Sequence, residues 1–432
     1  MTAHSVLLAH PGNAPFVQHA ARALHEAGLL AGYATTFAYE PDSTLGRALR
    51  VGLRPLFANP ARELARRRID EVPPELVLTT PLPELLRMLA LKLRLGPVLG
   101  DMVWEQSERW FSRHMARRYA ARASAVYSYE HVALEPFIAA KARGGLCIYD
   151  QPIAHHATLS AILDEEYALF PEAQTDYDAH LRANAARRHA RMAEELQLAD
   201  LVIAASSFTR ASLVRAGVAP ERIAVIPYGS PPVDAAPAPR GQGPLIFLSA
   251  GSQSLRKGTH YLLEAWRQLR PSLEAELWLV GHMALPPHLL RDLPGNVVLK
   301  PSLPRAELDT LYRRAAALVF PSLCEGFGQV ISEAMARGLP VITTPNTAGP
   351  DLITHGRDGL LVPIRDPASL AEAMQWCLDH PAALEELGRA ALERAAAWQW
   401  ADYRRTLGGF VAALLAAPTT EPHDTLSAEA RR

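Results

Sequence analysis

Short apolar runs alternate with amphipathic stretches along almost the whole chain, and the series occurs twice. We expect strands at 5–9, 125–129, 146–149, 201–204 and 223–226 in the first series, and at 245–250, 276–280, 297–299, 317–320 and 340–343 in the second. Strands that alternate with helices form parallel sheets covered by helices. Between the two series lies 231–244, which is too rich in proline for the interior of an element. The sequence therefore predicts an α/β protein with two Rossmann-like domains that face each other across a ligand-binding cleft.

The same patterns suggest where each domain begins and ends. We expect the first domain to span 1–230, with an Arg-rich helical insertion at about 45–122, and the second to span 245–397 after a Pro-rich linker. A helical pattern at 398–416 is expected to cross back to the first domain. The polar residues 417–432 are typical of a flexible tail.

Charge and cysteine content narrow the functional class. The 432 residues carry 44 Lys and Arg against 45 Asp and Glu, so the balance argues against a nucleic-acid-binding protein. Four of the 44 basic residues are lysines, which makes each lysine conspicuous. Three cysteines without a CxxC pair suit neither a disulfide framework nor a structural zinc site. Because no apolar run approaches the roughly 20 residues of a membrane span, we expect a cytoplasmic protein.

The most informative segment is 319–338, in which an apolar run leads into a glycine-containing turn and then a helical pattern. Gly326 and Gly328 let the backbone approach a ligand closely, and the start of the following helix favours an anion. Glu325 lies in the turn and Glu333 lies early in the helix, so the two carboxylates can flank one bound molecule. The alternative interpretation is an ordinary strand-turn-helix unit with two surface glutamates.

A second turn of the same kind carries Arg256 and Lys257 directly before Gly258. A guanidinium fork and a compact ammonium group both suit phosphate oxygens. Taken alone, this triplet is more often a solvated helix start. Its place in the same half as Glu325, and the scarcity of lysine, favour a phosphate site.

These motifs resemble the retaining family-four glycosyltransferases, also called glycosyl transferases group 1, of the GT-B fold. The resemblance covers nearly all of 245–393, where the chain also contains Gly338-Leu-Pro-Val-Ile-Thr-Thr-Pro and Gly359-Leu-Leu-Val. The first half is similar more loosely, through His10-Pro-Gly12 and Tyr149-Asp-Gln-Pro-Ile-Ala-His155-His156.

The resemblance implies a hexosyltransferase-type enzyme that moves a sugar from a nucleotide-diphosphate sugar to a glycan or lipid-linked acceptor with retention of the anomeric configuration. It implies no cofactor and no metal. A nucleotide-sugar epimerase or hydrolase on the same scaffold is an alternative, as is a non-catalytic nucleotide-sugar-binding protein.

The resemblance also implies a role for each site residue. These roles are donor-diphosphate binding by Arg256, Lys257 and Gly12; nucleoside binding by Glu333, Gly281 and Leu303; backbone contact with the donor sugar by Gly326, Phe327 and Gly328; and catalysis by Glu325 and His155. One position departs from the pattern, because Ala250-Gly251-Ser252 stands where many relatives carry an arginine. Gly349 and Asp351 depart from the pattern of the downstream element and are left without a role.

Two further features have open interpretations. The adjacent His155 and His156 lack the spacing of a metal site, so a cleft histidine or a structural histidine is favoured over a metal ligand. From Arg47 to Arg122 there are fifteen basic residues against eight acidic ones, among leucines at helical spacing. This insertion predicts either a basic face that contacts an anionic membrane from the cytoplasmic side or helices packed on the domain with solvated arginines.

Overall fold

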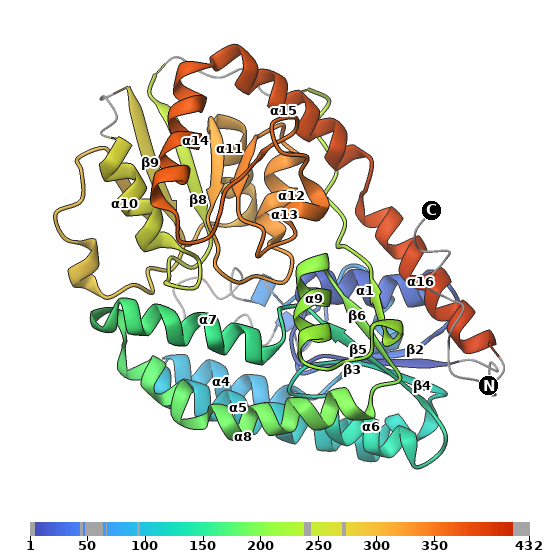
Figure 1. Cartoon of the computed structure of the whole chain (residues 1–432). Helices are drawn as coiled ribbons and strands as arrows, with labels where there is room; N and C mark the ends of the chain where they lie inside the picture. The colour runs from blue at the N-terminus through green and yellow to red at the C-terminus, as the bar shows by residue number, and fades with distance from the viewer. Residues whose placement is uncertain are drawn as a thin grey trace.

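The computed structural model describes residues 5–43, 46–47, 64–65, 67–92, 96–236, 243–269 and 274–417. Within these residues the chain forms two parallel α/β units, which are stacked one above the other in Figure 1. The first sheet has seven strands in the order β3-β2-β1-β4-β5-β6-β7, and the second has six in the order β10-β9-β8-β11-β12-β13. The predicted α/β class with two Rossmann-like sheets is therefore confirmed.

The strands of the first sheet are β1 (Val6–Ala9), β2 (Leu30–Thr35), β3 (Val77–Thr79), β4 (Ala125–Tyr129), β5 (Leu146–Gln151), β6 (Leu201–Ala204) and β7 (Ile223–Val225). Those of the second sheet are β8 (Leu245–Ala250), β9 (Ala275–Val280), β10 (Val297–Lys300), β11 (Ala317–Phe320), β12 (Val341–Thr343) and β13 (Leu360–Leu361).

The helices of the first half are α1 (Pro15–Glu26), α4 (Pro81–Lys92), α5 (Gly96–Arg118), α6 (Leu134–Lys141), α7 (His156–Leu169), α8 (Asp176–Leu198) and α9 (Ser207–Arg215). Those of the second half are α10 (Thr259–Leu269), α11 (Arg305–Arg314), α12 (Gln329–Met335), α13 (Gly349–Leu352), α14 (Pro367–Asp379), α15 (Pro381–Ala396) and α16 (Trp400–Ala416).

All ten expected strands are present, and three more were missed. β2 mixes alanine, glycine and threonine with larger residues, and β13 has two residues, so neither gives a clear periodic signal. β3 lies inside 45–122, which we expected to be helical throughout, and that expectation is wrong at 77–79. The strand forms because it pairs with β2 at the edge of the sheet, a long-range contact that overrides local pattern.

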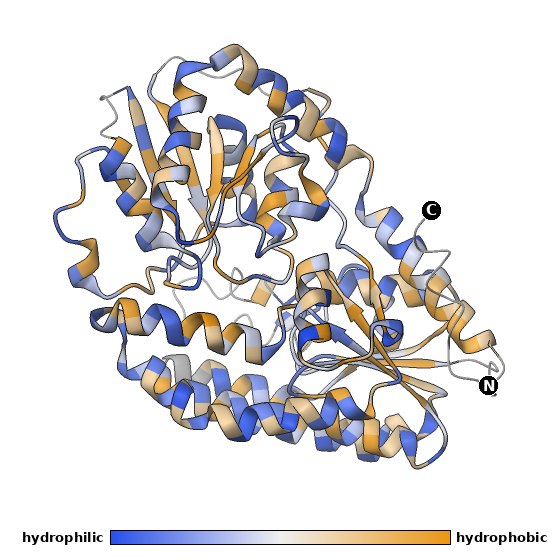
Figure 2. Ribbon diagram, in the orientation of Figure 1, coloured by the Kyte–Doolittle hydropathy of each residue, from blue (hydrophilic) through white to orange (hydrophobic). Residues whose placement is uncertain are grey.

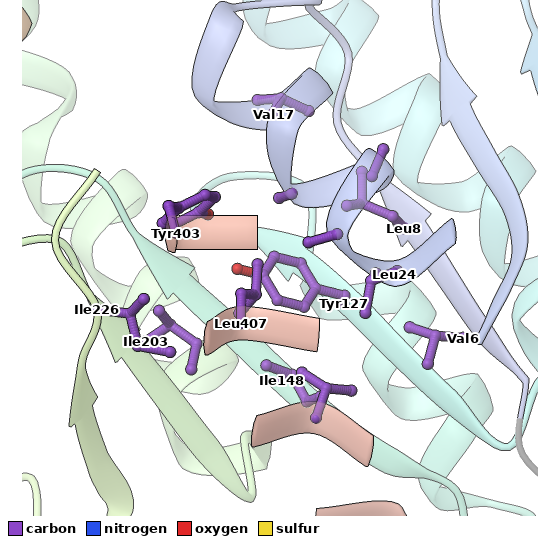
Figure 3. Packing of buried hydrophobic residues seen from close by; sticks show 14 of the residues in the cluster. Val6, Leu8, Val17, Leu24, Tyr127, Ile148, Ile203, Ile226, Tyr403 and Leu407 are labelled. Carbon is purple, nitrogen blue, oxygen red and sulfur yellow. The ribbon is translucent and has the colours of Figure 1, made fainter. Parts of the chain in front are cut away.

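The last helix packs on the opposite half of the molecule. α16 lies against α1, and Figure 3 shows Tyr403 and Leu407 of α16 beside Tyr127 in the core of the first sheet. Figure 2 shows the apolar strands at the centre of each unit, with mixed polar and apolar helices around them. The chain therefore crosses between the two units twice.

The two crossings lie next to each other. The N–H of Ser230 donates to the carbonyl oxygen of Trp398 at 3.0 Å, and the N–H of Trp400 donates to that of Ser230 at 3.2 Å. A Cβ on Gly229 would lie 2.3 Å from the Trp400 nitrogen. We call Gly229, Ser230, Trp398 and Trp400 the hinge contact.

A buried carboxylate lies beneath the hinge contact. Asp150, near the end of β5, accepts a hydrogen bond from the Tyr127 hydroxyl at 2.6 Å through Oδ2, and its Oδ1 has no hydrogen-bond partner. Burial raises the pKa of Asp150 to about 7. Tyr228, which follows β7, is buried near the same carboxyl.

Part of the expected linker is anchored. Asp234 receives Arg313 Nε at 2.7 Å, and its N–H donates to the Ala336 carbonyl oxygen at 3.0 Å, so this residue packs on the second unit. Residues 237–242 and 418–432 lie outside the described residues. The expected domain boundaries and the flexible tail therefore stay predictions. In the described part of the chain, no helix is long and apolar enough to cross a bilayer.

Candidate active site

The turn between β11 and α12 depends on two glycines. A Cβ on Gly326 would lie 1.8 Å from the carbonyl oxygen of Pro152. Gly328 has a φ of +81°, and its Cβ would lie 2.9 Å from the Phe320 ring. Both positions therefore resist any side chain. Because Pro152 belongs to the first unit, this turn lies at the boundary between the two units.

The Glu325 carboxylate in this turn binds two cations. Arg256 Nη1 lies 3.0 Å from Glu325 Oε2, and Lys257 Nζ forms an ion pair with the same oxygen. Lys257 Nζ also lies 4.6 Å from the centre of the Phe320 ring, in cation–π contact. We call Arg256, Lys257 and Glu325 the charge cluster. Its two cations and one carboxylate leave one net positive charge.

The charge cluster fixes the state of its carboxylate. Burial raises the pKa of Glu325, but the neighbouring charges of Lys257 and Arg256 outweigh burial and bring the pKa below its ordinary value. Burial lowers the pKa of Lys257, and Glu325 opposes that effect. A carboxylate that is ionised and already holds two cations is a poor proton acceptor.

Backbone contacts between the two turns hold the charge cluster in place. Gly258 has a φ of +67°, and a Cβ there would lie 2.1 Å from the carbonyl oxygen of Pro321. The N–H of Leu323 donates to the Arg256 carbonyl oxygen at 2.9 Å. The start of α10 and the turn after β11 are therefore packed backbone to backbone.

The thiol of Cys324 is buried beside the charge cluster. Arg256 Nη1 donates to the Cys324 carbonyl oxygen at 2.9 Å. Burial raises the pKa of the thiol to about 12, so it stays protonated. This agrees with a packed thiol rather than a nucleophile.

Glu333 lies in a separate polar contact on α12. It receives the Tyr312 hydroxyl at 3.2 Å and the Arg305 guanidinium at 3.2 Å. Burial raises the pKa of Glu333. Leu303, just before α11, packs partly buried against the core beneath these groups. Tyr312 and Arg305 were not singled out from sequence, although Arg305 lies two residues after Leu303, which was expected to bind the nucleoside.

Gly281 occupies a tight crossing at the end of β9. Its φ is +140°, and a Cβ would lie 1.8 Å from the Gly251 carbonyl oxygen. Its N–H donates to the Lys300 carbonyl oxygen at 3.0 Å. Gly251, where relatives carry an arginine nearby, also has a positive φ, and a Cβ there would meet nothing within 4 Å. The backbone at the ends of β8 and β9 is therefore partly open on the Gly251 side.

Gly12 lies in the loop after β1. Its N–H donates to His10 Nδ1 at 2.9 Å, and its carbonyl oxygen accepts the Tyr33 hydroxyl at 3.1 Å. His10 Nδ1 also lies 2.8 Å from the Gly12 carbonyl oxygen, and burial lowers the pKa of this imidazole to about 4, so the ring is neutral. The loop is thus held in a fixed shape.

His155 is the N-terminal cap of α7. Its Nδ1 accepts the N–H of Ala157 at 3.2 Å, and its own N–H donates to Ser212 Oγ at 2.8 Å. Burial lowers its pKa. The ring lies 3.9 Å from that of His156, which stacks on His189 at 4.3 Å, as measured between ring centres. Because Nδ1 is an acceptor, the proton of the neutral ring is on Nε2.

The start of α9 and the Glu325 turn meet at the boundary. The hydroxyls of Ser206 and Thr209 donate to the Gly326 carbonyl oxygen, the latter at 3.3 Å. Phe327 is buried against Tyr228 of the first unit, with ring centres 5.2 Å apart. Among the described residues, no hydrogen bond or ion pair connects Gly12, Gly281 or Glu333 to the charge cluster.

Two acidic residues that were given no role also join the two units. Asp351 Oδ2 accepts the N–H of Ser207 at 2.9 Å. Glu166 on α7 is fully buried, and its carboxylate binds His260 Nε2 at 2.9 Å and the Arg365 guanidinium. We call Glu166, His260 and Arg365 the domain latch. The domain latch could not be predicted from the sequence, because its members are about 100 residues or more apart.

The described residues contain no group of three or more His, Cys, Asp or Glu side chains arranged to hold a metal ion.

Comparison with known proteins gives consistent results. Residues 244–380 match the family model described as glycosyl transferases group 1. A D-inositol 3-phosphate glycosyltransferase of Catenulispora acidiphila is 30% identical over 270 residues, which cover 56% of this chain and 61% of that protein. The chain therefore aligns with less than two thirds of that relative.

Two solved structures show the fold over the full length. A sucrose-phosphate synthase from Thermosynechococcus elongatus has a TM-score of 0.63 at 20% identity, covering 96% of this chain and all of that one. The Anabaena protein HepE in complex with UDP has a TM-score of 0.60 at 15% identity, covering 95% of this chain and all of that one. Residues 244–380 are therefore a glycosyl transferases group 1 domain, set in a chain that has the two-domain GT-B fold of glycosyltransferases.

Proposed function

We propose that this protein transfers a sugar from a nucleotide-diphosphate sugar to an acceptor, with retention of the anomeric configuration and without a bound metal. The charge cluster is the observation that carries the proposal. It gives a group 1 domain a net positive site at the boundary with the first unit, beside the backbone of Gly326 and the loop of His155.

The charge cluster suits a departing diphosphate. When the bond between the anomeric carbon and the phosphate oxygen breaks, the electron pair stays on the diphosphate. Arg256 offers a planar pair of donors and Lys257 a compact charge to receive it. Such groups, already held in place, stabilise developing charge without reorganising during the reaction. Glu325 would keep both cations oriented, and these cations would supply the positive charge that a metal supplies elsewhere.

The remaining groups have complementary tasks in this proposal. Glu333 would accept hydrogen bonds from the ribose hydroxyls, and the end of β9 at Gly281 would border the base. His155, protonated on Nε2, would donate to the sugar. Gly12 would offer its backbone from across the cleft. The acceptor hydroxyl would attack from the face that the diphosphate leaves and pass its proton to a departing phosphate oxygen.

The donor test starts from UDP-sugars, because the similar HepE structure contains UDP. The purified protein is incubated with a panel of nucleotide sugars, and release of nucleoside diphosphate is measured with and without acceptor extract. Lys257→Ala should lower kcat by about 100-fold, as loss of one charge-stabilising donor does in other enzymes. Glu333→Ala should instead raise the KM for the donor. Lys141→Ala, which changes an exposed lysine paired with Asp200, is the matched control.

Several results would contradict the proposal. Full activity of both Lys257→Ala and Glu333→Ala would show that the donor does not bind at this site. Donor conversion that never depends on acceptor would indicate an epimerase or a hydrolase, and tight nucleotide binding without turnover would indicate a binding protein. Inversion of the anomeric signal in the NMR spectrum of the fresh product would exclude retention. Loss of activity in a chelator would exclude metal independence.

We also propose that the acceptor is a glycan or a lipid-linked molecule and that the α4–α5 pair contacts an anionic membrane from the cytoplasmic side. Apolar side chains stand exposed on both helices, with Leu82 57%, Leu86 51%, Leu99 48% and Met102 50% accessible. We call these four residues the apolar ridge. Exposed apolar groups clustered in this way are typical of an interaction surface.

Acidic side chains near the apolar ridge lie on the side of α5 that contacts α8. Asp101 and Glu105 of α5 point to α8, where they bind Arg187 and Arg188. Arg113 of α5 is 59% exposed on its side chain. Asp101 and Glu105 are thus neutralised on the inner side, whereas Arg113 has a single long contact with Glu135 at 3.9 Å, so exposed apolar side chains and this arginine would face anionic lipid headgroups. The basic residues at 48–63, at 66 and at 94 lie outside the described residues.

Vesicle flotation tests the contact. The protein should float with vesicles that contain anionic lipid and stay in the soluble fraction with neutral ones. The double variant Leu82→Ser/Leu86→Ser should lose flotation, whereas Leu299→Ser, at a 42% exposed leucine of the second unit, should keep it. If the wild-type protein stays in the soluble fraction equally with both kinds of vesicle, the proposed membrane contact is wrong.

A further inference from the structure

A cavity of about 580 Å³ lies beside the hinge contact. Most of its wall consists of apolar side chains, among them Ile226, Trp398 and Phe410, and no member of the charge cluster belongs to it. Cavities of this size with largely apolar walls are typical of sites for small molecules. We call this space the hinge cavity.

Both units contribute to the wall of the hinge cavity. The first unit contributes Ile226, and α16, which packs on that unit, contributes Phe410. The second unit contributes Met335, Leu352 and Arg394, from α12, α13 and α15. A change in the angle between the units therefore changes the shape of the cavity. A molecule that fits the cavity while the domain latch is formed binds that arrangement better and favours it.

One wall of the hinge cavity is a helix that also reaches the candidate active site. Ser332 and Met335 of α12 line the cavity and lie about one helical turn apart. Glu333 lies on a different face of the same helix, where its carboxylate contacts Tyr312 and Arg305. A molecule in the hinge cavity therefore contacts a helix that carries a residue proposed to bind the donor.

Arg394 brings a positive charge to the wall of the hinge cavity, and its side chain is exposed. Its Nε donates to the Leu352 carbonyl oxygen at 3.2 Å, and its Nη2 donates to the Asp351 carbonyl oxygen at 3.0 Å. Among the described residues, Nη1 has no hydrogen-bond partner and no ion pair joins Arg394 to a carboxylate. The Asp351 carboxylate is directed to the first unit, where it accepts the N–H of Ser207 at 2.9 Å. The guanidinium is therefore held in place with its charge unpaired.

We propose that the hinge cavity binds a small apolar molecule with one anionic group, and that this ligand favours the arrangement in which the domain latch is formed. The anionic group pairs with the guanidinium of Arg394, which two carbonyl contacts already hold in place. The apolar body lies against Ile226, Trp398 and Phe410, where it is removed from water. The ligand therefore acts on the closure of the two units from a place other than the candidate active site. The site goes beyond the proposed function, because its occupant is neither donor nor acceptor.

Fluorescence titration measures binding to the full chain without any nucleotide sugar. Anilinonaphthalene sulfonate has an apolar body and one anionic group, and phenylnaphthylamine has the same body without the charge. Wild type should bind both probes. Arg394→Gln should weaken binding of the sulfonate by about tenfold, as loss of one hydrogen bond to a charged group does, and should leave binding of the neutral probe unchanged. Arg389→Gln, which changes an exposed arginine of α15 paired with Glu386, is the matched control.

Thermal melting checks that each variant is folded, and Arg394→Lys, which keeps the charge, should bind the sulfonate more tightly than Arg394→Gln does. Absence of binding of both probes to wild type would overturn the proposal, as would an equal loss of both probes in Arg394→Gln. If the double variant Leu82→Ser/Leu86→Ser lost the sulfonate while Arg394→Gln kept it, the probe would bind at the apolar ridge and the proposal would be wrong.

The effect on the domain latch is measured by hydrogen exchange. The amides of α7 and α10, which carry Glu166 and His260, should exchange more slowly in wild type with the sulfonate, by up to about tenfold at ten times its Kd. At the same concentration the slowing in Arg394→Gln should be about twofold. Unchanged exchange in wild type with the probe bound would overturn the effect on the latch. Neither measurement contains a donor, so a chain that binds the probe in this way but transfers no sugar would refute the proposed function and leave the hinge cavity assigned.

Discussion

The boundary between the two units is held at two places by different chemistry. At the hinge contact, Ser230 exchanges backbone hydrogen bonds with Trp398 and Trp400. At the domain latch, the buried carboxylate of Glu166 binds His260 and Arg365. The backbone groups of the hinge contact are closely packed, so the two segments cannot move apart without breaking contacts. Their hydrogen bonds do not depend on pH, because no ionisable group takes part. Ion pairs tolerate opening, because water solvates the separated groups.

This difference between the hinge contact and the domain latch indicates where the boundary between the two units can open. Figure 1 shows α7 directly under α10, on the side of the molecule away from the point where α15 leads into α16. If the domain latch opens, we expect the two units to swing about the hinge contact and to expose the charge cluster, which lies at the same boundary. Donor binding and product release in enzymes commonly need such a motion.

The largest expected effect comes from filling the hinge contact. Gly229→Ala places a methyl group about where backbone atoms of residues 399 and 400 already lie, 2.3 Å from the Trp400 nitrogen. Overpacking of this kind lowers the free energy of unfolding by about 1–3 kcal/mol. Thermal unfolding measures it. Gly409→Ala on α16 is the matched control, since a Cβ there meets nothing within 4 Å. A Gly229→Ala protein as stable as wild type would show that the hinge contact is not tightly packed.

The next effect concerns the carboxylate beneath the hinge contact. Burial raises the pKa of Asp150 to about 7, so the folded chain keeps a proton that the unfolded chain releases above about pH 4. The unfolded state then binds fewer protons, and the free energy of unfolding falls as the pH rises from about 4 to 7. Asp150→Asn, which does not titrate, should remove most of this fall. Urea unfolding at several pH values measures it, and equal slopes for variant and wild type would contradict the expectation.

A smaller effect is expected at the domain latch. Burial raises the pKa of Glu166, but His260 and Arg365 outweigh it and hold the pKa below its ordinary value. The contribution of the Glu166 carboxylate is therefore fully present above about pH 4.5 and weakens as the pH falls through its lower folded pKa. Glu166→Gln should shift the closure equilibrium by about tenfold toward the open form. Small-angle scattering should show a larger radius of gyration, while thermal unfolding changes little.

The smallest effect is expected at Glu165, at the exposed edge of the domain latch, and its variant is the control for Glu166→Gln. Arg365 also pairs with Glu165, whose side chain is 62% exposed. Solvent-exposed pairs contribute about 0–1 kcal/mol, so Glu165→Gln should change the closure equilibrium by less than about fivefold. If Glu165→Gln opened the protein as much as Glu166→Gln, charge at the rim rather than the buried carboxylate would hold the latch.

The features that could be predicted from sequence are local ones. The Glu325 turn and the Arg256-Lys257-Gly258 start of α10 each combine a buried strand, glycines and a helix within about fifteen residues. Their meeting also follows from topology, since β8 and β11 are neighbours in the sheet and carry their loops to the same edge. Glu325 was expected to face the sugar, and its ion pairs with both cations came from the structure.

The features that could not be predicted depend on distant pairing. Glu166 lies ten residues after His156 in the sequence, but its partners, His260 and Arg365, lie in the other unit. The arginines of α8 that take up the acidic groups of α5 are about 80 residues away from them. No periodicity in one segment reveals which charges another segment will neutralise. For that reason the excess of basic residues at 47–122 could be counted from the sequence. Which face of the helices the charged side chains occupy could not be predicted.

The burial of Cys324 has a practical consequence. The thiol lies under the charge cluster, whereas Cys147 and Cys377 are buried inside the cores of the first and second units. A thiol reagent therefore reaches Cys324 when the two turns separate, and it reaches the other two when a whole unit unfolds. The rate at which a thiol reagent modifies Cys324 therefore reports local opening between the two turns, and the rates for Cys147 and Cys377 report unfolding of each unit, without any engineered label.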